Sequence, residues 1–128
     1  MSSAPPGLRF YGVVDADSVS AEPLHDELHD NGTHTVTFRD LAAVVAPAPY
    51  MRATPGEAEL ADFVHVVDAL AKRGPVLPAP PGTVFRNARV LEHWMEVHYA
   101  KLHEALGVVE QRADKSAPYE YVRMELGA

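Results

Sequence analysis

Residues 33–47 constrain the fold most, because they form two consecutive strand patterns of different kinds. In 33–38 (THTVTF), threonines alternate with larger side chains, the period of two expected of a strand. Residues 41–47 (LAAVVAP) are apolar throughout, so this strand is expected to be buried on both faces. Arg39 and Asp40 leave room only for a tight turn between them. The pattern therefore predicts an antiparallel hairpin inside a sheet.

The N-terminal third predicts one more strand and a polar connection. Residues 1–7 are small and rich in proline and glycine, which is typical of a flexible arm. Residues 8–14 (LRFYGVV) have the aromatic and β-branched content of a strand, in which Gly12 marks a bulge or a close backbone approach. Residues 15–32 are polar and predict a loop with a short helix opened by Pro23.

A capped helix follows the hairpin, from about residue 54 to Arg73. Thr54 is the expected N-cap, with Pro55 at the first helical position and Glu57 completing a capping box. Gly74 and the proline after it end the helix. Its predicted buried stripe consists of Leu60, Phe63, Val64, Val67, Leu70 and Ala71.

The second half of the chain predicts an extended segment and a second long helix. Residues 75–85 contain four prolines and end in the short apolar piece 83–85, so they run as extended chain. Asn87 is the expected N-cap of a helix over roughly 88–106, which Gly107 ends. Its predicted buried stripe consists of Val90, Leu91, Trp94, Val97, Leu102 and Leu106.

Two further strands are predicted at 108–112 and 119–126, which gives the order β-β-β-α-(β)-α-β-β. This order favours an α+β fold, an antiparallel sheet with the two long helices packed on one face. At 128 residues, the chain 1–128 is expected to form a single domain.

Composition excludes several classes of function. There is no cysteine, which rules out disulfides, thiolate metal sites and a cysteine nucleophile. The formal net charge of −7 disfavours nucleic-acid binding. No apolar run approaches the roughly 20 residues of a membrane span, and no signal peptide is apparent, so a cytoplasmic protein is expected. The absence of isoleucine and the excess of arginine over lysine suggest a GC-rich bacterial genome.

The histidines do not form a convincing metal site. His25 and His29 have the i, i+4 spacing of a helical pair, but the metalloprotease pattern needs glutamate directly after the first histidine. His93, His98 and His103 recur every five residues, which rotates successive side chains about 140° apart on a helix. They cannot converge on one ion. We therefore expect neither a metal nor a cofactor.

No catalytic constellation was identified either. Glu92 and Glu96 could act as paired carboxylates, but Arg89 and Lys101 on the same predicted helix make an exposed charged face the simpler interpretation. The chain has no nucleophile elbow and no phosphate-binding glycine loop. The residues alone predict a protein that is not an enzyme.

Three segments taken in order carry a family resemblance: residues 8–14 (LRFYGVV), 38–49 (FRDLAAVVAPAP) and 74–85 (GPVLPAPPGTVF). Together with 66–70 (VVDAL) on the intervening helix, they resemble the N-terminal domain of the GvpL/GvpF family of gas vesicle proteins. The resemblance covers roughly residues 8–112. It implies a ferredoxin-like domain that assists gas vesicle assembly by binding the shell protein and other accessory proteins, without catalysis.

The chain departs from the family pattern in two respects. Pro80 and Pro81 stand where relatives usually have an arginine and an aromatic residue before the Gly-Thr-Val-Phe segment. Full-length relatives also continue into a helical C-terminal domain. The first departure puts in doubt whatever contact that arginine makes in the family.

The expected partner-binding surface combines the Pro-rich segment with the start of the second helix. Its candidate residues are Pro78, Pro80, Pro81, Arg86 and Arg89. Edge strands and a groove between helix and sheet are the ways in which such a domain could bind a partner.

An alternative hypothesis is a small dimeric ferredoxin-like domain that binds a small ligand or haem, with oxygenase-like activity. Its pocket would be built from His65, Trp94, His98 and Tyr99.

Overall fold

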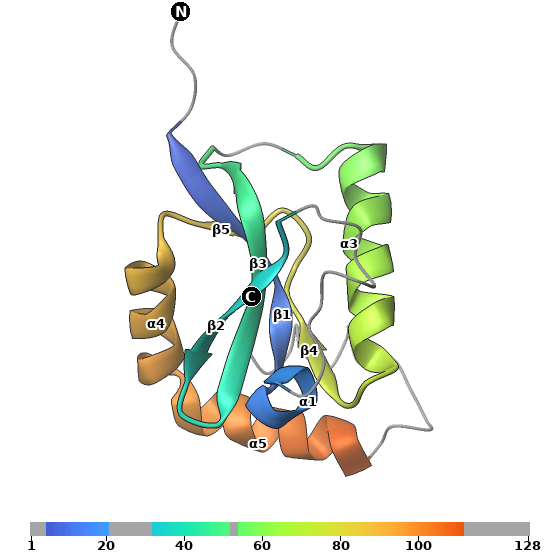
Figure 1. The fold of residues 1–128 in the computed structure, drawn as a ribbon, viewed down its shortest axis with the longest axis vertical. Coiled ribbons are helices and arrows are strands. Elements are labelled where there is room, and N and C mark those ends of the chain that lie inside the picture. Colours follow the sequence, from blue (N-terminus) through green and yellow to red (C-terminus); the bar gives the residue numbers. More distant parts are fainter. Residues whose placement is uncertain (1–4, 21–31, 52–53, 112–128) are drawn as a thin grey trace, which may run out of the picture.

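The computed structural model describes residues 5–20, 32–51 and 54–111. Five strands and four helices occur in this part of the chain (Figure 1). In chain order they are β1 (Pro6–Asp15), α1 (Ala16–Ser20), β2 (His34–Phe38), β3 (Leu41–Pro49), α3 (Glu57–Ala71), β4 (Val76–Pro78), β5 (Val84–Phe85), α4 (Ala88–Val97) and α5 (Tyr99–Gln111).

The sheet has the strand order β2-β3-β1-β4, and every neighbouring pair is antiparallel. β5 also pairs with β1, further toward its N-terminal end than β4 does. The predicted hairpin is confirmed, since Val36 pairs with Ala43 and Phe38 with Leu41. The elements from β1 to β4 follow the β-α-β-β-α-β order of a ferredoxin-like domain, so the predicted α+β class with an antiparallel sheet is confirmed.

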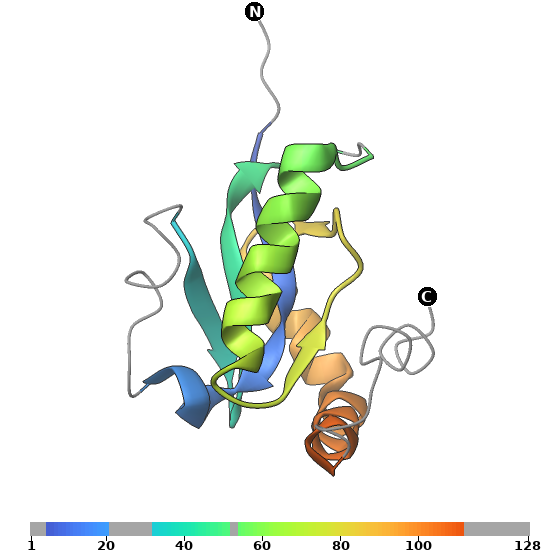
Figure 2. The same ribbon diagram turned by 90° about the vertical axis from the view of Figure 1, so that its right-hand side faces the viewer.

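The long helices lie on opposite faces of the sheet, so the prediction that both pack on one face is wrong (Figure 2). Alternate residues of β3 explain why. Ala42, Val44 and Ala46 pack with α3, whereas Leu41, Ala43 and Val45 pack with α4 and α5. Because both faces of β3 are apolar, each needs its own helical cover.

The predicted helix over 88–106 is in fact two helices. α4 ends at Val97, and His98 leaves helical geometry with φ −102° and ψ 11° before α5 begins. Gly107 does not end the helix, and residues 108–111 of the strand predicted at 108–112 form the last turn of α5, because the apolar side of that helix continues there. The strand predicted at 119–126 lies outside the described residues.

The start of α3 also differs from the prediction. Gly56, not Thr54, is the N-cap, and its backbone N–H donates to Oε1 of Glu59 at 3.1 Å. A carboxylate at the third position therefore satisfies the helix start without a capping hydroxyl. The helix expected at Pro23 lies outside the described residues, and α1 instead follows β1 directly.

Five residues predicted to be buried are exposed, among them Ala71 at the end of α3. Leu60 and Val64 on α3 are 40% and 55% exposed, and Val90 and Val97 on α4 are 41% and 63% exposed. The apolar side of each helix is thus wider than the part that the sheet covers.

Gly12 confirms the predicted bulge and close approach. The β1–β3 register shifts between Phe10 and Gly12. A Cβ atom at Gly12 would lie only 2.5 Å from the carbonyl oxygen of Leu77 on β4. Backbone atoms cannot rotate away, so a side chain here would separate β1 from β4.

We therefore expect Gly12→Ala to lower the free energy of unfolding by about 1–3 kcal/mol, the usual cost of overpacking. The matched control is Gly107→Ala, where a Cβ atom meets nothing within 4 Å. In a helix this control should gain up to about 1 kcal/mol. Urea denaturation of both variants checks the pair, and equal effects of the two substitutions would contradict this account.

Tyr11 joins the sheet to α3 through a buried hydroxyl. Its side chain is fully buried and stacks on Phe63, with ring centroids 6.2 Å apart. The hydroxyl donates to Oδ2 of Asp62 at 2.6 Å, and the Arg9 guanidinium lies 3.7 Å from the same carboxylate. Burial, followed by the hydrogen bond to Asp62, raises the pKa of Tyr11 to about 12.

This shift predicts a loss of stability at alkaline pH. A tyrosine whose pKa is raised on folding stabilises the fold fully below its unfolded pKa near 10 and loses that contribution as pH rises toward 12. The loss should reach roughly 2–3 kcal/mol, as about two pKa units imply. Denaturation measured from pH 9 to 12 checks this. Tyr11→Phe should be less stable at neutral pH and should show a flatter alkaline decline.

Candidate partner-binding surface

The structure separates Pro78 from the other candidate residues. Pro78 is buried at the end of β4 and pairs with Gly12, so it cannot contact a partner. Pro80 and Pro81 are exposed on the turn between β4 and β5. This turn is held by Thr83, whose Oγ1 and backbone N–H donate to the carbonyl oxygen of Pro80 at 2.7 Å and 3.2 Å. The predicted surface therefore keeps its exposed prolines and loses Pro78.

Arg86 follows β5 and lies against an aromatic ring. Its guanidinium carbon is 5.8 Å from the ring centroid of Tyr50, just beyond β3. Gly7 on β1 leaves the space for this arrangement, since a Cβ there would lie 2.9 Å from Cβ of Tyr50 and 3.0 Å from Cγ1 of Val84. The cation–π contact, typically about 0.5–1 kcal/mol at an exposed site, positions the guanidinium at this end of the sheet.

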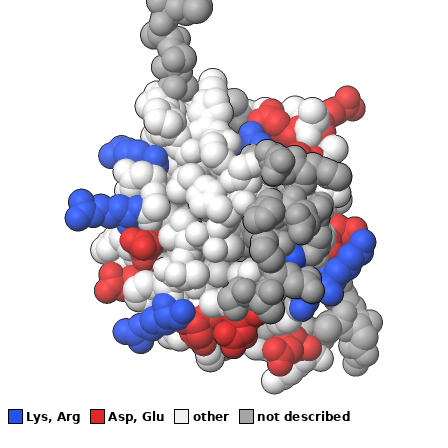
Figure 3. All heavy atoms as spheres, viewed as in Figure 1, with Lys and Arg blue, Asp and Glu red and all other residues white. Residues whose placement is uncertain are grey.

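Arg89 lies in the first turn of α4, close in sequence to Arg86. The side chain of Asn87 caps this helix by accepting from the backbone N–H of Val90 at 2.9 Å, as predicted. Both arginines are exposed, and basic side chains project where β5 leads into α4 (Figure 3). Cations at a helix N-terminus oppose the helix dipole, so these arginines do not serve the stability of α4.

An apolar strip continues this basic end along α4. Val90, Trp94 and Val97 share one side of the helix at its 3.6-residue period. Trp94 is half-buried and contacts the rings of Phe10 at 5.5 Å and Phe85 at 5.6 Å. We call the whole region the α4–β5 surface, which consists of Phe85, Arg86, Arg89, Val90, Trp94 and Val97.

The four residues of the alternative ligand pocket do not converge. Trp94 and His98 are neighbours, with ring centroids 5.2 Å apart, and His98 is half-buried. His65, however, is on α3, across the sheet from both. Tyr99 hydrogen-bonds to Asp40 instead. Nothing in this geometry favours a haem or small-ligand pocket built from these four side chains.

The other titratable side chains show no metal centre within the described ranges. No cluster of three or more metal-ligating side chains occurs among residues 5–20, 32–51 and 54–111. His93 and His103 are exposed. His25 and His29 lie outside the described residues.

Sequence reasoning missed one polar cluster, at the β2–β3 turn. The Tyr99 hydroxyl donates to Oδ1 of Asp40 at 2.5 Å, and Nε2 of His103 is 3.2 Å from Oδ2 of the same carboxylate. Arg39, at φ 55°, places its guanidinium carbon 5.2 Å from the Tyr99 ring centroid. Only the short turn Arg39-Asp40 was visible in the sequence, because its partners are some 60 residues away.

This cluster attaches the first turn of α5 to the hairpin. The hydrogen bond from Tyr99 holds the pKa of Asp40 below its ordinary value, and the same bond raises the pKa of Tyr99. The hydrogen bond between Tyr99 and Asp40 therefore requires an ionised Asp40 carboxylate and a protonated Tyr99 hydroxyl. It is lost as pH falls through the lowered pKa of Asp40, or as pH rises through the raised pKa of Tyr99.

Tyr99→Phe should release the start of α5 while α4 keeps its protection. Hydrogen exchange followed by mass spectrometry should show faster exchange in residues 99–103 at neutral pH, because the side-chain contact to Asp40 is removed. The control is His93→Ala, which removes only an exposed contact to Glu96 at 3.8 Å. Unchanged exchange in Tyr99→Phe would show that the cluster does not hold α5.

Comparison with known proteins identifies the family. The sequence profile of the gas vesicle synthesis protein GvpL/GvpF family matches residues 7–115. The chain therefore belongs to the GvpL/GvpF family, and the resemblance seen in its sequence is confirmed.

A solved structure shares the fold. The crystal structure of the gas vesicle protein GvpF from Anabaena sp. PCC7120 superposes with a TM-score of 0.61 over 84% of this chain, at 17% sequence identity. The chain spans 44% of the length of that protein. No curated protein matches the sequence. Among the described helices, none has the length and apolar character needed to cross a membrane.

Proposed function

We propose that this protein is a non-enzymatic gas vesicle assembly factor that binds the shell protein and other accessory proteins through its α4–β5 surface. Family membership over residues 7–115 supports the gas vesicle role. A protein with this role would act in the cytoplasm, in association with the gas vesicle.

The observation that carries the choice of surface is the pair of exposed arginines beside exposed apolar side chains. Arg86 and Arg89 lie at the positive end of the α4 dipole, where they reduce the stability of the helix. Val90 and Val97 are exposed beside them. A surface with an apolar strip and a charged margin suits a partner helix that is apolar on one side and acidic at its edge.

The turn between β4 and β5 also belongs to the proposed binding region. Pro80 and Pro81 are exposed next to the α4–β5 surface in sequence, and prolines present a rigid apolar contour at small entropic cost. We include them as a flanking contact of the proposed surface, in place of the arginine and aromatic residue usual in the family.

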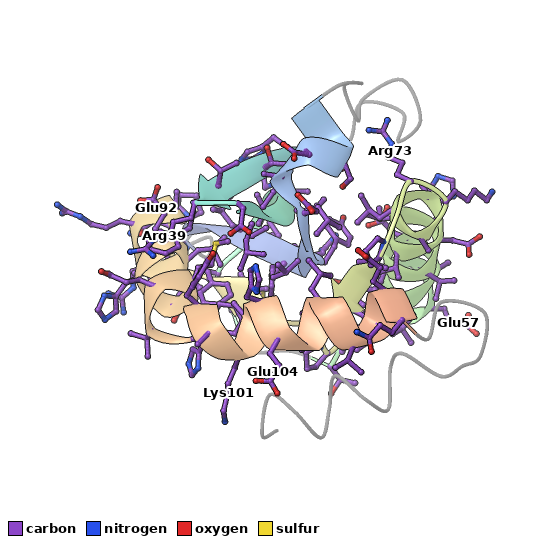
Figure 4. The ribbon with its side chains drawn as sticks, turned by 90° about the horizontal axis from the view of Figure 1, so that it is seen from below. Arg39, Glu57, Arg73, Glu92, Lys101 and Glu104 are labelled. Carbon is purple, nitrogen blue, oxygen red and sulfur yellow. The ribbon has the colours of Figure 1, made fainter. Side chains whose placement is uncertain are left out.

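The test is a pull-down of the purified chain against the shell protein and accessory proteins of the same host. Arg86→Glu combined with Arg89→Glu should weaken binding by about tenfold or more, because charge reversal at an interface repels the former partner. Lys101→Glu is the matched control, since Lys101 points away from the sheet on the outer side of α5 (Figure 4). This control should bind as the wild type does.

A second variant separates the apolar contribution from the charged one. Val97 is 63% exposed, so Val97→Asp should fold normally while weakening the interaction. Raising the salt concentration from about 0.1 M to 0.5 M should weaken the wild type several-fold without abolishing binding. Full binding by the arginine and valine variants would exclude this surface, and no wild-type binding to any gas vesicle protein would overturn the proposed function itself.

A further inference from the structure

A second exposed stripe, on α3, has the opposite charge. Glu57, Leu60, Val64 and Asp68 lie on one side of this helix at its 3.6-residue period, and all four are exposed. The two apolar side chains are therefore bounded by a carboxylate at each end. We call these four residues the α3 stripe.

The α3 stripe and the α4–β5 surface complement each other. Each offers two exposed aliphatic side chains on one flank of a helix, Leu60 and Val64 in one case and Val90 and Val97 in the other. The α3 stripe has a carboxylate at each end, whereas the α4–β5 surface has Arg86 and Arg89 where its helix starts, before Glu92 and Glu96 follow on α4. An antiparallel arrangement of the two helices brings Asp68, near the C-terminal end of α3, toward Arg89 in the first turn of α4.

We propose that the α3 stripe of one molecule docks on the α4–β5 surface of a second copy of this chain. We favour a second copy as the partner because one chain carries both complementary surfaces, the α3 stripe and the α4–β5 surface. The inference goes beyond the proposed function, because it concerns association of the chain with itself and needs no gas vesicle partner.

The placement of the two surfaces fixes the kind of assembly. α3 and α4 lie on opposite faces of the sheet (Figure 2 and Figure 4). One neighbouring molecule therefore cannot occupy both surfaces at once. When two molecules associate, the first keeps a free α4–β5 surface or α3 stripe, and the second keeps the other of the two. Such a heterologous contact generates a head-to-tail chain, either open or closed into a ring, instead of a two-fold dimer.

The association should be weak. Two pairs of aliphatic side chains form a small patch compared with a stable interface, and a net charge of −7 on every copy opposes association. A partner bound to the α4–β5 surface would occupy one end of the chain and stop its growth there.

Sedimentation velocity of the purified chain, measured up to about 1 mM, tests the proposal. The wild type should sediment faster as concentration rises, with no plateau at twice the monomer mass. Asp68→Lys and Arg89→Glu should each lower the association constant by about tenfold, because each opposes like charges across the contact. The matched controls, Glu104→Lys and Lys101→Glu, make the same charge changes on the outer side of α5 (Figure 4) and should associate as the wild type does.

Mixing the two surface variants gives a sharper test. Asp68→Lys places a basic side chain on the α3 stripe, so that this stripe and the α4–β5 surface both carry positive charge. Arg89→Glu places an acidic side chain on the α4–β5 surface, so that both surfaces carry negative charge. Neither should associate alone, yet an equimolar mixture should associate again, since each contact then pairs opposite charges. Each variant alone, measured at the total protein concentration of the mixture, is the reference for this experiment.

Three results would overturn the proposal: a wild type that remains monomeric at about 1 mM, an association that Asp68→Lys and Arg89→Glu leave unchanged, or a closed dimer. Binding of Asp68→Lys to the gas vesicle proteins reports on the proposed function separately. This variant leaves the α4–β5 surface intact and should be captured as the wild type is.

Discussion

The architecture depends on the burial of both faces of β3. Every residue from Leu41 to Ala46 is at most 2% exposed, so no side of this strand can face water. β1 pairs along the whole of β3 and has the same double-sided burial at Phe10 and Tyr11, which belong to opposite cores. A sheet with two apolar faces must carry a helical layer on each. α3 and the α4–α5 pair supply these layers. Each layer leaves apolar side chains exposed on one side of a helix, Leu60 and Val64 on α3 and Val90 and Val97 on α4.

Patterns of short range predicted the elements well. The β2–β3 hairpin and the Asn87 cap depend on residues within a few positions of one another, where the local backbone decides the outcome. Gly12 indicated a close approach by its residue type alone, although the neighbouring strand is distant in the sequence. The opposite placement of the helices was not predicted, although the evidence for it was present. The apolar run 41–47 already required cover on both faces, and the strand and helix order alone does not say which face each helix takes.

Other features depend on contacts between distant parts of the chain, which periodicity cannot report. The break at His98 coincides with the point where Tyr99 turns to reach Asp40, 59 residues away in the sequence. Gly107 is tolerated inside α5 because Leu106 and Val109 on either side of it keep the helix packed against the core. For the candidate site, Arg86 and Arg89 were identified by their charge, whereas the contributions of Tyr50 and of exposed Val90 and Val97 required the fold.

The two helix N-termini differ in a way that bears on function. α3 begins with Glu57 and Glu59, carboxylates that favour the positive end of the dipole and cap its backbone. α4 has no acidic residue in its first turn and has Arg89 there instead. Each such charge typically costs or contributes about 0.3–1 kcal/mol, so the α3 start is optimised for stability and the α4 start is not. Since the cap of α4 is otherwise well formed by Asn87, Arg89 needs an explanation outside the fold. A binding partner with negative charge, whether another protein or the acidic stripe of a second copy, provides one.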